Sequence, residues 1–395
     1  MVRAGRRFKR ALGASMTSLL ALVIIEALTG YELIYFRTGL IEMPSLLILL
    51  PALMAMRGNI NGPYVLRLIS SLHLGRAEAR FLSRYNGFWL ATTLSLMVVA
   101  TSLVYLGAVG LSTALGIPTP PLEEFLIIAL LTSSLSFTVA APIMTLATVL
   151  LYRGGYQVSA IVPPVSMSLT DALTPVILFA SVELTQQMSK LAKLGVSGAM
   201  IAAAVAALYF AQKREAGVRK VVKENLPVAV VNALISGSGG SFLAKMPDLV
   251  TRTGLVAAVP GLNCLVGSVA GSVASDVSVR LHLSGRLRFR EVMTEVTAFL
   301  ASAATSIAVL LVLVSQLSIA TGQIPVSLPA ALAAVSAGLT ASLALSLIAV
   351  WMSDAVFRRG VDPENVVFPT LTALGDFLTP MASVTFLLSF VRLLG

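Results

Sequence analysis

The stretch Pro51-Ala-Leu-Met-Ala-Met-Arg-Gly58-Asn59-Ile-Asn-Gly62 recurs 209 positions later as Pro260-Gly-Leu-Asn-Cys-Leu-Val-Gly267-Ser268-Val-Ala-Gly271. The proline and both glycines keep their places, and His73 recurs as His282 at the same offset. A second pair, Asp171-Ala-Leu-Thr-Pro175 and Asp376-Phe-Leu-Thr-Pro380, follows at an offset of 205. These matches indicate a duplicated unit with one aspartate in each copy.

The composition places both copies in a membrane. The chain is 57% hydrophobic and 12% charged, with a mean hydropathy of +0.90, whereas ordinary globular domains carry about 25% charged residues. Apolar runs at 88–106, 125–151 and 296–314 are long enough to cross a bilayer, which takes about 20 apolar residues. We therefore expect an all-α integral membrane protein with no soluble domain larger than a loop.

The net charge of +10 does not indicate nucleic-acid binding, because basic residues gather in short segments beside the apolar runs. This is the distribution of the positive-inside rule. The basic N-terminus precedes an apolar stretch without a small-residue cleavage site, so we interpret that stretch as a retained first span. The lone Cys264 excludes an internal disulfide and a cysteine-based metal site.

Apolar runs and helix breakers predict about eleven spans. They lie near 12–35, 40–58, 86–113, 123–150, 160–184, 196–211, 225–244, 250–267, 290–318, 327–353 and 365–391. Five spans per copy is an odd number, so a linking helix near 196–211 makes the two copies parallel. The predicted domains are a first five-helix repeat (1–185), a linking helix with its loop (186–222) and a second five-helix repeat (223–395).

The charge distribution supports an orientation with the N-terminus in the cytoplasm and the C-terminus outside the cell membrane. Leaving out Arg57, Arg67 and Arg280, which lie beside the repeated motifs, the predicted cytoplasmic segments hold roughly three times as many Lys and Arg residues as the outer segments.

Asp171 and Asp376 are the strongest candidates for ion binding. A carboxylate at the centre of a membrane helix costs about 2.5–3.5 kcal/mol, and such residues usually face a cavity or a partner. Pro175 and Pro380 each follow an aspartate by four positions and cannot donate the helical hydrogen bond to its carbonyl. The alternative is that each aspartate pairs with a neighbouring hydroxyl and only holds helices together.

Hydroxyl side chains flank both aspartates at helical spacing, and they are Ser168, Thr174, Thr372 and Thr379. We expect Pro163-Pro164 and Pro369 to break the helix upstream and free further carbonyls. Clustered oxygen donors suit a hard cation such as Mg²⁺, Ca²⁺ or Mn²⁺.

The repeated proline and glycine segments allow two interpretations. Each is expected to end an apolar span, where Asn59 and Ser268 would offer oxygens to a pore lined by Pro51, Pro260 and the four glycines. Alternatively, the small residues Gly58, Gly62, Gly267 and Gly271 form tight helix crossings. For His73 and His282, beside basic loops, we predict a structural role. No nucleotide-binding loop, zinc-protease motif or activated nucleophile is present, so we expect no enzyme.

At these residues the chain resembles the MgtE family of Mg²⁺ transporters and channels, in the duplicated form of the eukaryotic solute-carrier magnesium transporters. The segment from Pro51 to Gly75, with Asn59, Arg67 and His73, is similar to the second helix of the family unit. The segment Leu-Thr-Ala-Leu-Gly375-Asp376 is similar to its fifth helix. Ser-Leu-Thr-Asp171 is the weaker counterpart, and Ser268 replaces the expected asparagine.

The resemblance implies that Asp171 and Asp376 bind the cation in a pore between two pseudo-symmetric repeats, so that one chain acts as a pseudo-dimer. The expected substrate is Mg²⁺, with Mn²⁺, Co²⁺ or Ca²⁺ as related possibilities. Two alternatives remain open from the residues alone. One is a proton- or Na⁺-coupled secondary carrier of another solute, and the other is a non-transporting membrane scaffold.

Overall fold

The computed structural model describes residues 2–81, 83–155, 158–284, 287, 289–359 and 363–394. Within these ranges it describes only the backbone at 2–11, 14, 17, 159–161, 163–169, 216, 283–284, 289, 363–366 and 368–369.

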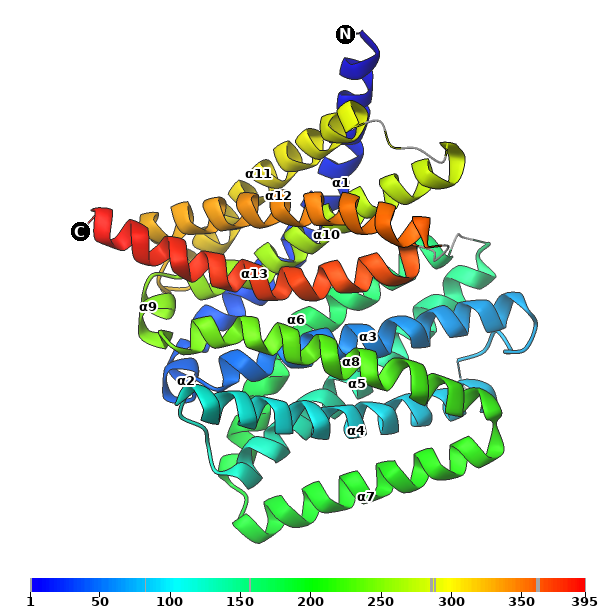
Figure 1. Ribbon diagram of the computed structural model, residues 1–395. Coiled ribbons are helices and arrows are strands. Elements are labelled where there is room, and N and C mark those ends of the chain that lie inside the picture. The colour runs from blue at the N-terminus through cyan, green and yellow to red at the C-terminus, as the bar shows by residue number, and fades with distance from the viewer. Residues whose placement is uncertain are drawn as a thin grey trace. The chain divides into compact units, whose positions relative to one another are not determined.

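The described part of the chain is all-α, as predicted, and no strand occurs in it. The helices are α1 (Val2–Tyr35), α2 (Arg37–Glu42), α3 (Leu46–His73), α4 (Arg84–Leu115), α5 (Leu122–Arg153), α6 (Val158–Gln186), α7 (Lys190–Arg214), α8 (Ala216–Ala244), α9 (Pro247–Arg252), α10 (Leu255–Ser284), α11 (Phe289–Ala320), α12 (Leu328–Arg358) and α13 (Pro363–Leu394). Figure 1 shows their order along the chain.

Among the described residues, nine helices are long and apolar enough to cross a membrane. They belong to α1, α4, α5, α7, α8, α10, α11, α12 and α13. The protein is therefore a multi-pass membrane protein. The helices α3 and α6 are also of spanning length, at 28 and 29 residues, and the count of eleven spans stays a prediction.

The chain forms two compact units that do not follow the two halves of the sequence. Unit 1 comprises Met1–Glu42 and Ser238–Gly395, and unit 2 comprises Met43–Gly237. Helix α1 therefore belongs to the unit that holds α9–α13, while most of α8 belongs to the unit that holds α3–α7. The predicted domain boundaries describe the sequence repeat and stay a prediction.

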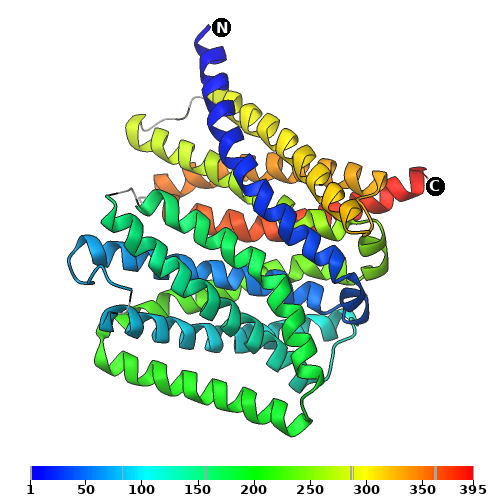
Figure 2. The ribbon, with the colours of Figure 1, turned by 180° about the vertical axis from the view of Figure 1, so that it is seen from behind.

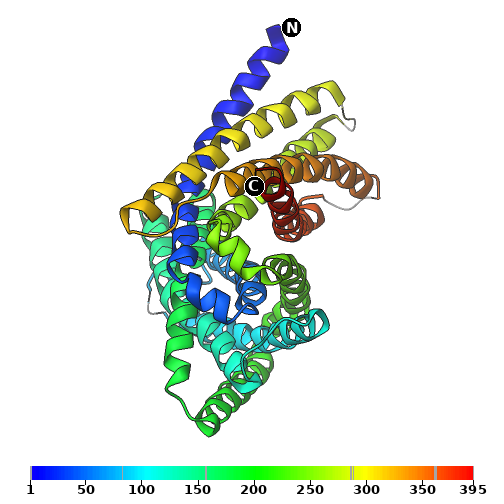
Figure 3. The ribbon, with the colours of Figure 1, turned by 90° about the vertical axis from the view of Figure 1, so that its left-hand side faces the viewer.

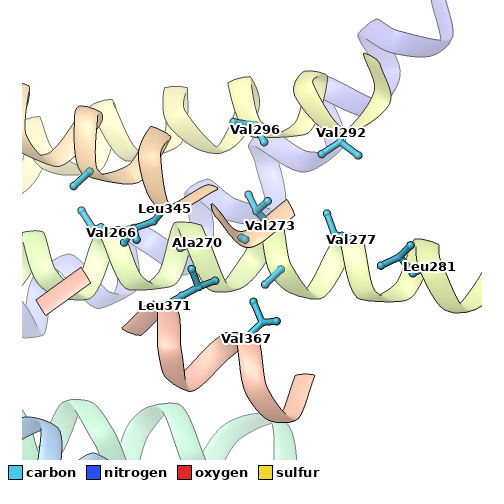
Figure 4. Packing of buried hydrophobic residues seen from close by; sticks show 13 residues of the cluster. Val266, Ala270, Val273, Val277, Leu281, Val292, Val296, Leu345, Val367 and Leu371 are labelled. Atoms are coloured by element: carbon cyan, nitrogen blue, oxygen red, sulfur yellow. The ribbon is translucent and has the colours of Figure 1, made fainter. Parts of the chain in front are cut away.

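Helix α10 carries the central apolar face of unit 1. Val266, Ala270, Val273, Val277 and Leu281 follow one another at intervals of three or four residues, so they share one face of the helix. Figure 4 shows this face meeting side chains of α11, α12 and α13.

Helix α1 completes unit 1 by packing on α10 and α11, and it runs beside α11 in Figures 2 and 3. Gly30 lies so close to α10 that an added Cβ would overlap the carbonyl group of Ala257. The close approach of these two backbones therefore depends on glycine.

In unit 2, helix α7 packs against α4 and α5 at the edge of the unit (Figure 1). Val98, Leu130 and Ala204 form an apolar cluster at this contact. The Nζ atom of Lys193 pairs with Glu124 at the start of α5. The predicted linking helix thus has a defined packing position in unit 2.

The predicted helix ends at the repeated motifs are wrong. Helix α3 continues through Gly58 as far as His73, and α10 continues in the same way to Ser284. Helices α6 and α13 also run unbroken across Pro163-Pro164 and Pro369. A proline removes one helical hydrogen bond, and a helix in a membrane tolerates the loss where neighbouring helices and side chains satisfy the freed carbonyl.

The two repeats make equivalent internal contacts. The rings of His73 and Tyr152 lie 5.1 Å apart edge to face, and those of His282 and Phe357 lie 5.2 Å apart in the same way. Tyr152 and Phe357 are related by the offset of 205 that also relates the two aspartates. Each histidine thus contacts the corresponding ring in its own unit, which agrees with the predicted structural role.

The packing of α1 can be tested with two glycine substitutions in the same helix. Gly30→Ala should lower the melting temperature in detergent, because overpacking costs about 1–3 kcal/mol and exceeds the helix-propensity gain of about 0.5–1 kcal/mol. Gly13→Ala, whose new Cβ would have no neighbour within 4 Å, should not lower it. Equal melting temperatures for the two variants would contradict this packing.

Candidate functional site

The first half-site lies in unit 2, where α6 packs against α3. Asp171 of α6 faces Arg57 of α3, and the distance from Asp171 Oδ1 to Arg57 Nη2 is 4.0 Å. The side chain of Arg57 is fully buried, whereas a quarter of the Asp171 side chain is exposed. The guanidinium end of this ion pair is therefore enclosed by protein, whereas the carboxylate end is partly exposed at the protein surface.

Three further contacts hold the guanidinium group of Arg57. Its Nε donates to the carbonyl of Leu53 at 3.3 Å, and its Nη2 donates to the carbonyl of Thr170 at 3.1 Å. Nη2 also donates to Oγ1 of the fully buried Thr174. Because Thr170 and Thr174 flank Asp171 on α6, the guanidinium is fixed directly beside the aspartate.

The charges of Arg57 and Asp171 interact strongly because they lie close together and the arginine is buried. Two unit charges 4 Å apart attract each other by about 4 kcal/mol at the effective dielectric constant of many protein sites. Removing one partner of a buried ion pair costs about 3–5 kcal/mol, since the other charge remains desolvated.

The second half-site lies in unit 1, where α13 packs against α10. The residue that corresponds to Arg57 there is Val266, and the residue that corresponds to Thr170 is Gly375. Val266 is buried, and its Cγ1 would lie 3.7 Å from a Cβ added to Gly375. The two half-sites therefore share the same helix register, but Arg57 is replaced by an apolar side chain.

The hydroxyl groups on α13 near Asp376 differ in their hydrogen bonding from those of the first half-site. Thr379, the counterpart of Thr174, is fully buried. Among the described residues, Thr379 Oγ1 has no hydrogen-bond partner. Thr372 lies on the same helix, and its methyl group would be 3.9 Å from a Cβ added to Gly267.

Gly239 of α8 lies against the main chain of Asp376 in the second half-site. An added Cβ on Gly239 would overlap the main-chain carbonyl oxygen of Asp376. Helix α8 therefore approaches α13 closely at the aspartate, within unit 1.

Asn59 takes part in a hydrogen bond that sequence reasoning missed. Its Nδ2 donates to the carbonyl of Ala55 at 2.8 Å, and its Oδ1 accepts from Nδ2 of Asn232 on α8 at 3.1 Å. The corresponding Ser268 is partly buried in α10. Ion binding by Asn59 and Ser268 stays a prediction.

The other predicted site residues fall into three groups. The side chain of Ser168 lies outside the described residues. Pro175 and Pro380 are buried within α6 and α13, and Pro51 and Pro260 lie inside α3 and α10. Gly58, Gly62, Gly267 and Gly271 all lie within continuous helix, so a pore lined by a broken helix end is not formed at these glycines.

An ion-pair cluster surrounds Arg280. Arg280 contacts Asp276 at 2.6 Å, Glu291 at 3.2 Å and also Glu295. It thereby joins α10 to α11 in unit 1. In the described part of the chain, no group of three His, Cys, Asp or Glu side chains is arranged to hold a metal ion.

The Arg57–Asp171 pair generates a stability prediction. Asp171→Asn should lower the free energy of unfolding by roughly 2–4 kcal/mol, because it leaves a buried guanidinium without its counter-charge. Arg57→Met combined with Asp171→Asn should recover at least half of that loss. Melting temperatures in detergent would measure both effects. Equal destabilisation by the single and double variants would show that the two charges are not coupled.

Comparison with known proteins agrees with the duplicated arrangement. The model of the MgtE divalent cation transporter family matches the chain twice, over residues 50–181 and 259–386. The first match contains α3 to α6 up to Asp171 and beyond, and the second contains the corresponding part of α10 to α13. No solved structure matches the chain. With both half-sites inside matched segments that together cover more than half of its length, the chain belongs to the MgtE family of divalent cation transporters.

Proposed function

We propose that the protein moves Mg²⁺ or a related divalent cation across the membrane along a path lined by α6 and α13. Asp376 and Asp171 supply the carboxylates, helped by Thr372, Thr379 and Thr174. The observation that carries this proposal is the presence of one aspartate at the same position of each repeat. Both aspartates lie on helices that pack against the helix bearing the repeated proline and glycine segment.

One carboxylate per half-site, with hydroxyl and carbonyl oxygens around it, suits Mg²⁺ in particular. Mg²⁺ loses its water reluctantly and is usually bound through one or two carboxylates with several waters retained. The membrane potential acts on such a divalent ion with about 4.6 kcal/mol per 100 mV, so an electrical gradient provides a driving force. Mn²⁺, Co²⁺ and Ca²⁺ are the related substrates to compare.

The proposal includes the arrangement predicted from the sequence repeat. The pathway runs between the two repeats, a single chain acts as a pseudo-dimer, and the protein resides in the cell membrane with its N-terminus in the cytoplasm. The match of the family model to one segment in each half of the chain supports the pseudo-dimer part of this arrangement.

Mg²⁺ flux into proteoliposomes tests the proposal. The wild-type chain should transport Mg²⁺, whereas Asp376→Asn should reduce the flux at least ten-fold and Asp171→Asn/Asp376→Asn should abolish it. Asp248→Asn is the matched control, because Asp248 is an exposed carboxylate on α9 that pairs with Arg252 in its own helix turn. This control should retain the wild-type flux.

Three results would contradict the proposal. Unchanged Mg²⁺ flux in the double variant would remove the aspartates from the pathway. Flux that ignores Mg²⁺ but depends steeply on pH or Na⁺ would favour a coupled carrier of another solute. No flux of any divalent cation by the folded wild-type protein would favour a membrane scaffold.

A further inference from the structure

We propose that helix α7 of unit 2 binds one anionic phospholipid, with an acyl chain in an apolar groove on its exposed face and the phosphate at Lys213 and Arg214. This inference does not depend on the transport proposal, because α7 carries none of the residues assigned to the ion pathway. The observation behind it is that the groove ends about one helical turn before these two basic side chains.

The groove has a volume of about 710 Å³, and all of the described residues that line it belong to α7. Small side chains at every fourth position leave a hollow beside a parallel row of larger ones. The small row is Gly198, Ala202 and Ala206, the larger row is Ile201, Val205 and Tyr209, and Phe210 ends the groove. Val205 and Phe210 are 52% and 66% exposed, and α7 lies at the edge of unit 2 (Figure 1). The groove is therefore open to lipid along its length.

The length of the groove fits one acyl chain. Gly198 and Phe210 lie twelve positions apart in the sequence, which is about 18 Å along a helix axis at 1.5 Å per residue. One leaflet of a bilayer supplies about half of a hydrocarbon core that is about 30 Å thick. An acyl chain that fills the groove from Gly198 thus brings its headgroup to the end of α7 that bears Lys213.

Aromatic rings hold the two basic side chains at this end of the groove. The Nζ atom of Lys213 lies 4.3 Å from the centre of the Tyr209 ring, and the guanidinium carbon of Arg214 lies 5.8 Å from that of Phe88 on α4. Both basic residues are exposed, and neither forms an ion pair with a described carboxylate. Because tyrosine favours the membrane–water interface and lysine extends its charge into the headgroup layer, these residues can bind a lipid phosphate.

The charge around the groove end favours an anionic lipid over a second copy of the chain. Residues 213–223 include five Lys and Arg side chains and one acidic side chain, Glu215. Clusters of four to eight basic residues beside a membrane helix are typical of binding to anionic headgroups. A second copy in the same membrane orientation would bring the same positive charges against this end of α7, whereas a lipid phosphate neutralises them.

Native mass spectrometry of the full-length protein in detergent, with added phosphatidylglycerol or phosphatidylcholine, tests the inference. The wild-type chain should bind its first phosphatidylglycerol at least five-fold more tightly than phosphatidylcholine. Lys213→Gln should weaken phosphatidylglycerol binding about five-fold, the effect of one basic side chain beside anionic lipid, and adding Arg214→Gln should weaken it further. Lys190→Gln is the matched control, because it makes the same change at the other end of α7. It should leave the affinity unchanged.

Filling the groove tests the acyl-chain site separately. Ala202→Leu/Ala206→Leu keeps both basic residues and should weaken phosphatidylglycerol binding at least five-fold. Ala203→Leu/Ala207→Leu makes the same change at exposed positions of α7 outside the groove and should not weaken it.

Equal affinity of the wild-type chain for the two lipids would overturn the inference. Phosphatidylglycerol binding that is unchanged in either the charge variants or the filled-groove variant would also overturn it. A wild-type dimer that separates when the groove is filled would assign the groove to a second copy of the chain and would equally contradict a lipid site.

Discussion

A charge inside an apolar helix bundle must be matched by another charge or by hydrogen bonds, and this constraint governs the region around Asp171. Arg57 is fully buried in α3 and contacts one carboxylate, two carbonyls and one hydroxyl through Nε and Nη2, while its Nη1 has no hydrogen-bond partner among the described residues. These contacts fix the position of α6 against α3. In the second repeat, the same helix contact is made by Val266 and Gly375, so a buried valine takes the place of Arg57. Duplication has therefore preserved the helix packing while allowing the electrostatics of the two copies to diverge.

The arrangement of helices also shows how the duplicated chain is held together. Helix α1 packs with helices of the second repeat, and most of α8 belongs to the unit built from the first. A close backbone contact between Gly30 and Ala257 accompanies the placement of α1. Each compact unit therefore requires segments from both halves of the sequence, so neither half contains all of its packing partners.

Much of the fold could be predicted from the sequence, because hydropathy and repeat spacing report local structure directly. The all-α membrane class, the repeat and the family were predicted correctly. Helix ends at Gly58 and Gly267 were not, since a proline or glycine lowers the stability of an isolated helix while tertiary packing can maintain it. The exchange of α1 and α8 was not predicted either, because helical periodicity identifies an apolar face but does not identify its partner.

The site was predictable only in part, for a similar reason. The spacing identified the two aspartates, and an ionisable residue within an apolar span is by itself a signal of function. That signal was also present at Arg57, yet the sequence does not state how α3 and α6 are rotated against each other. The rotation of these two helices places Arg57 beside Asp171, and the packing of α3 against α8 brings Asn59 to Asn232.

The central claim is that a divalent cation binds beside the fifth-helix aspartate of the second repeat. Anomalous diffraction from crystals of the full-length protein grown with Mn²⁺ would locate the ion directly. The account predicts a peak within coordination distance of the Asp376 carboxylate or of a water bound to it, with Arg57 still beside Asp171. An ordered Mn²⁺ ion far from both aspartates would contradict it.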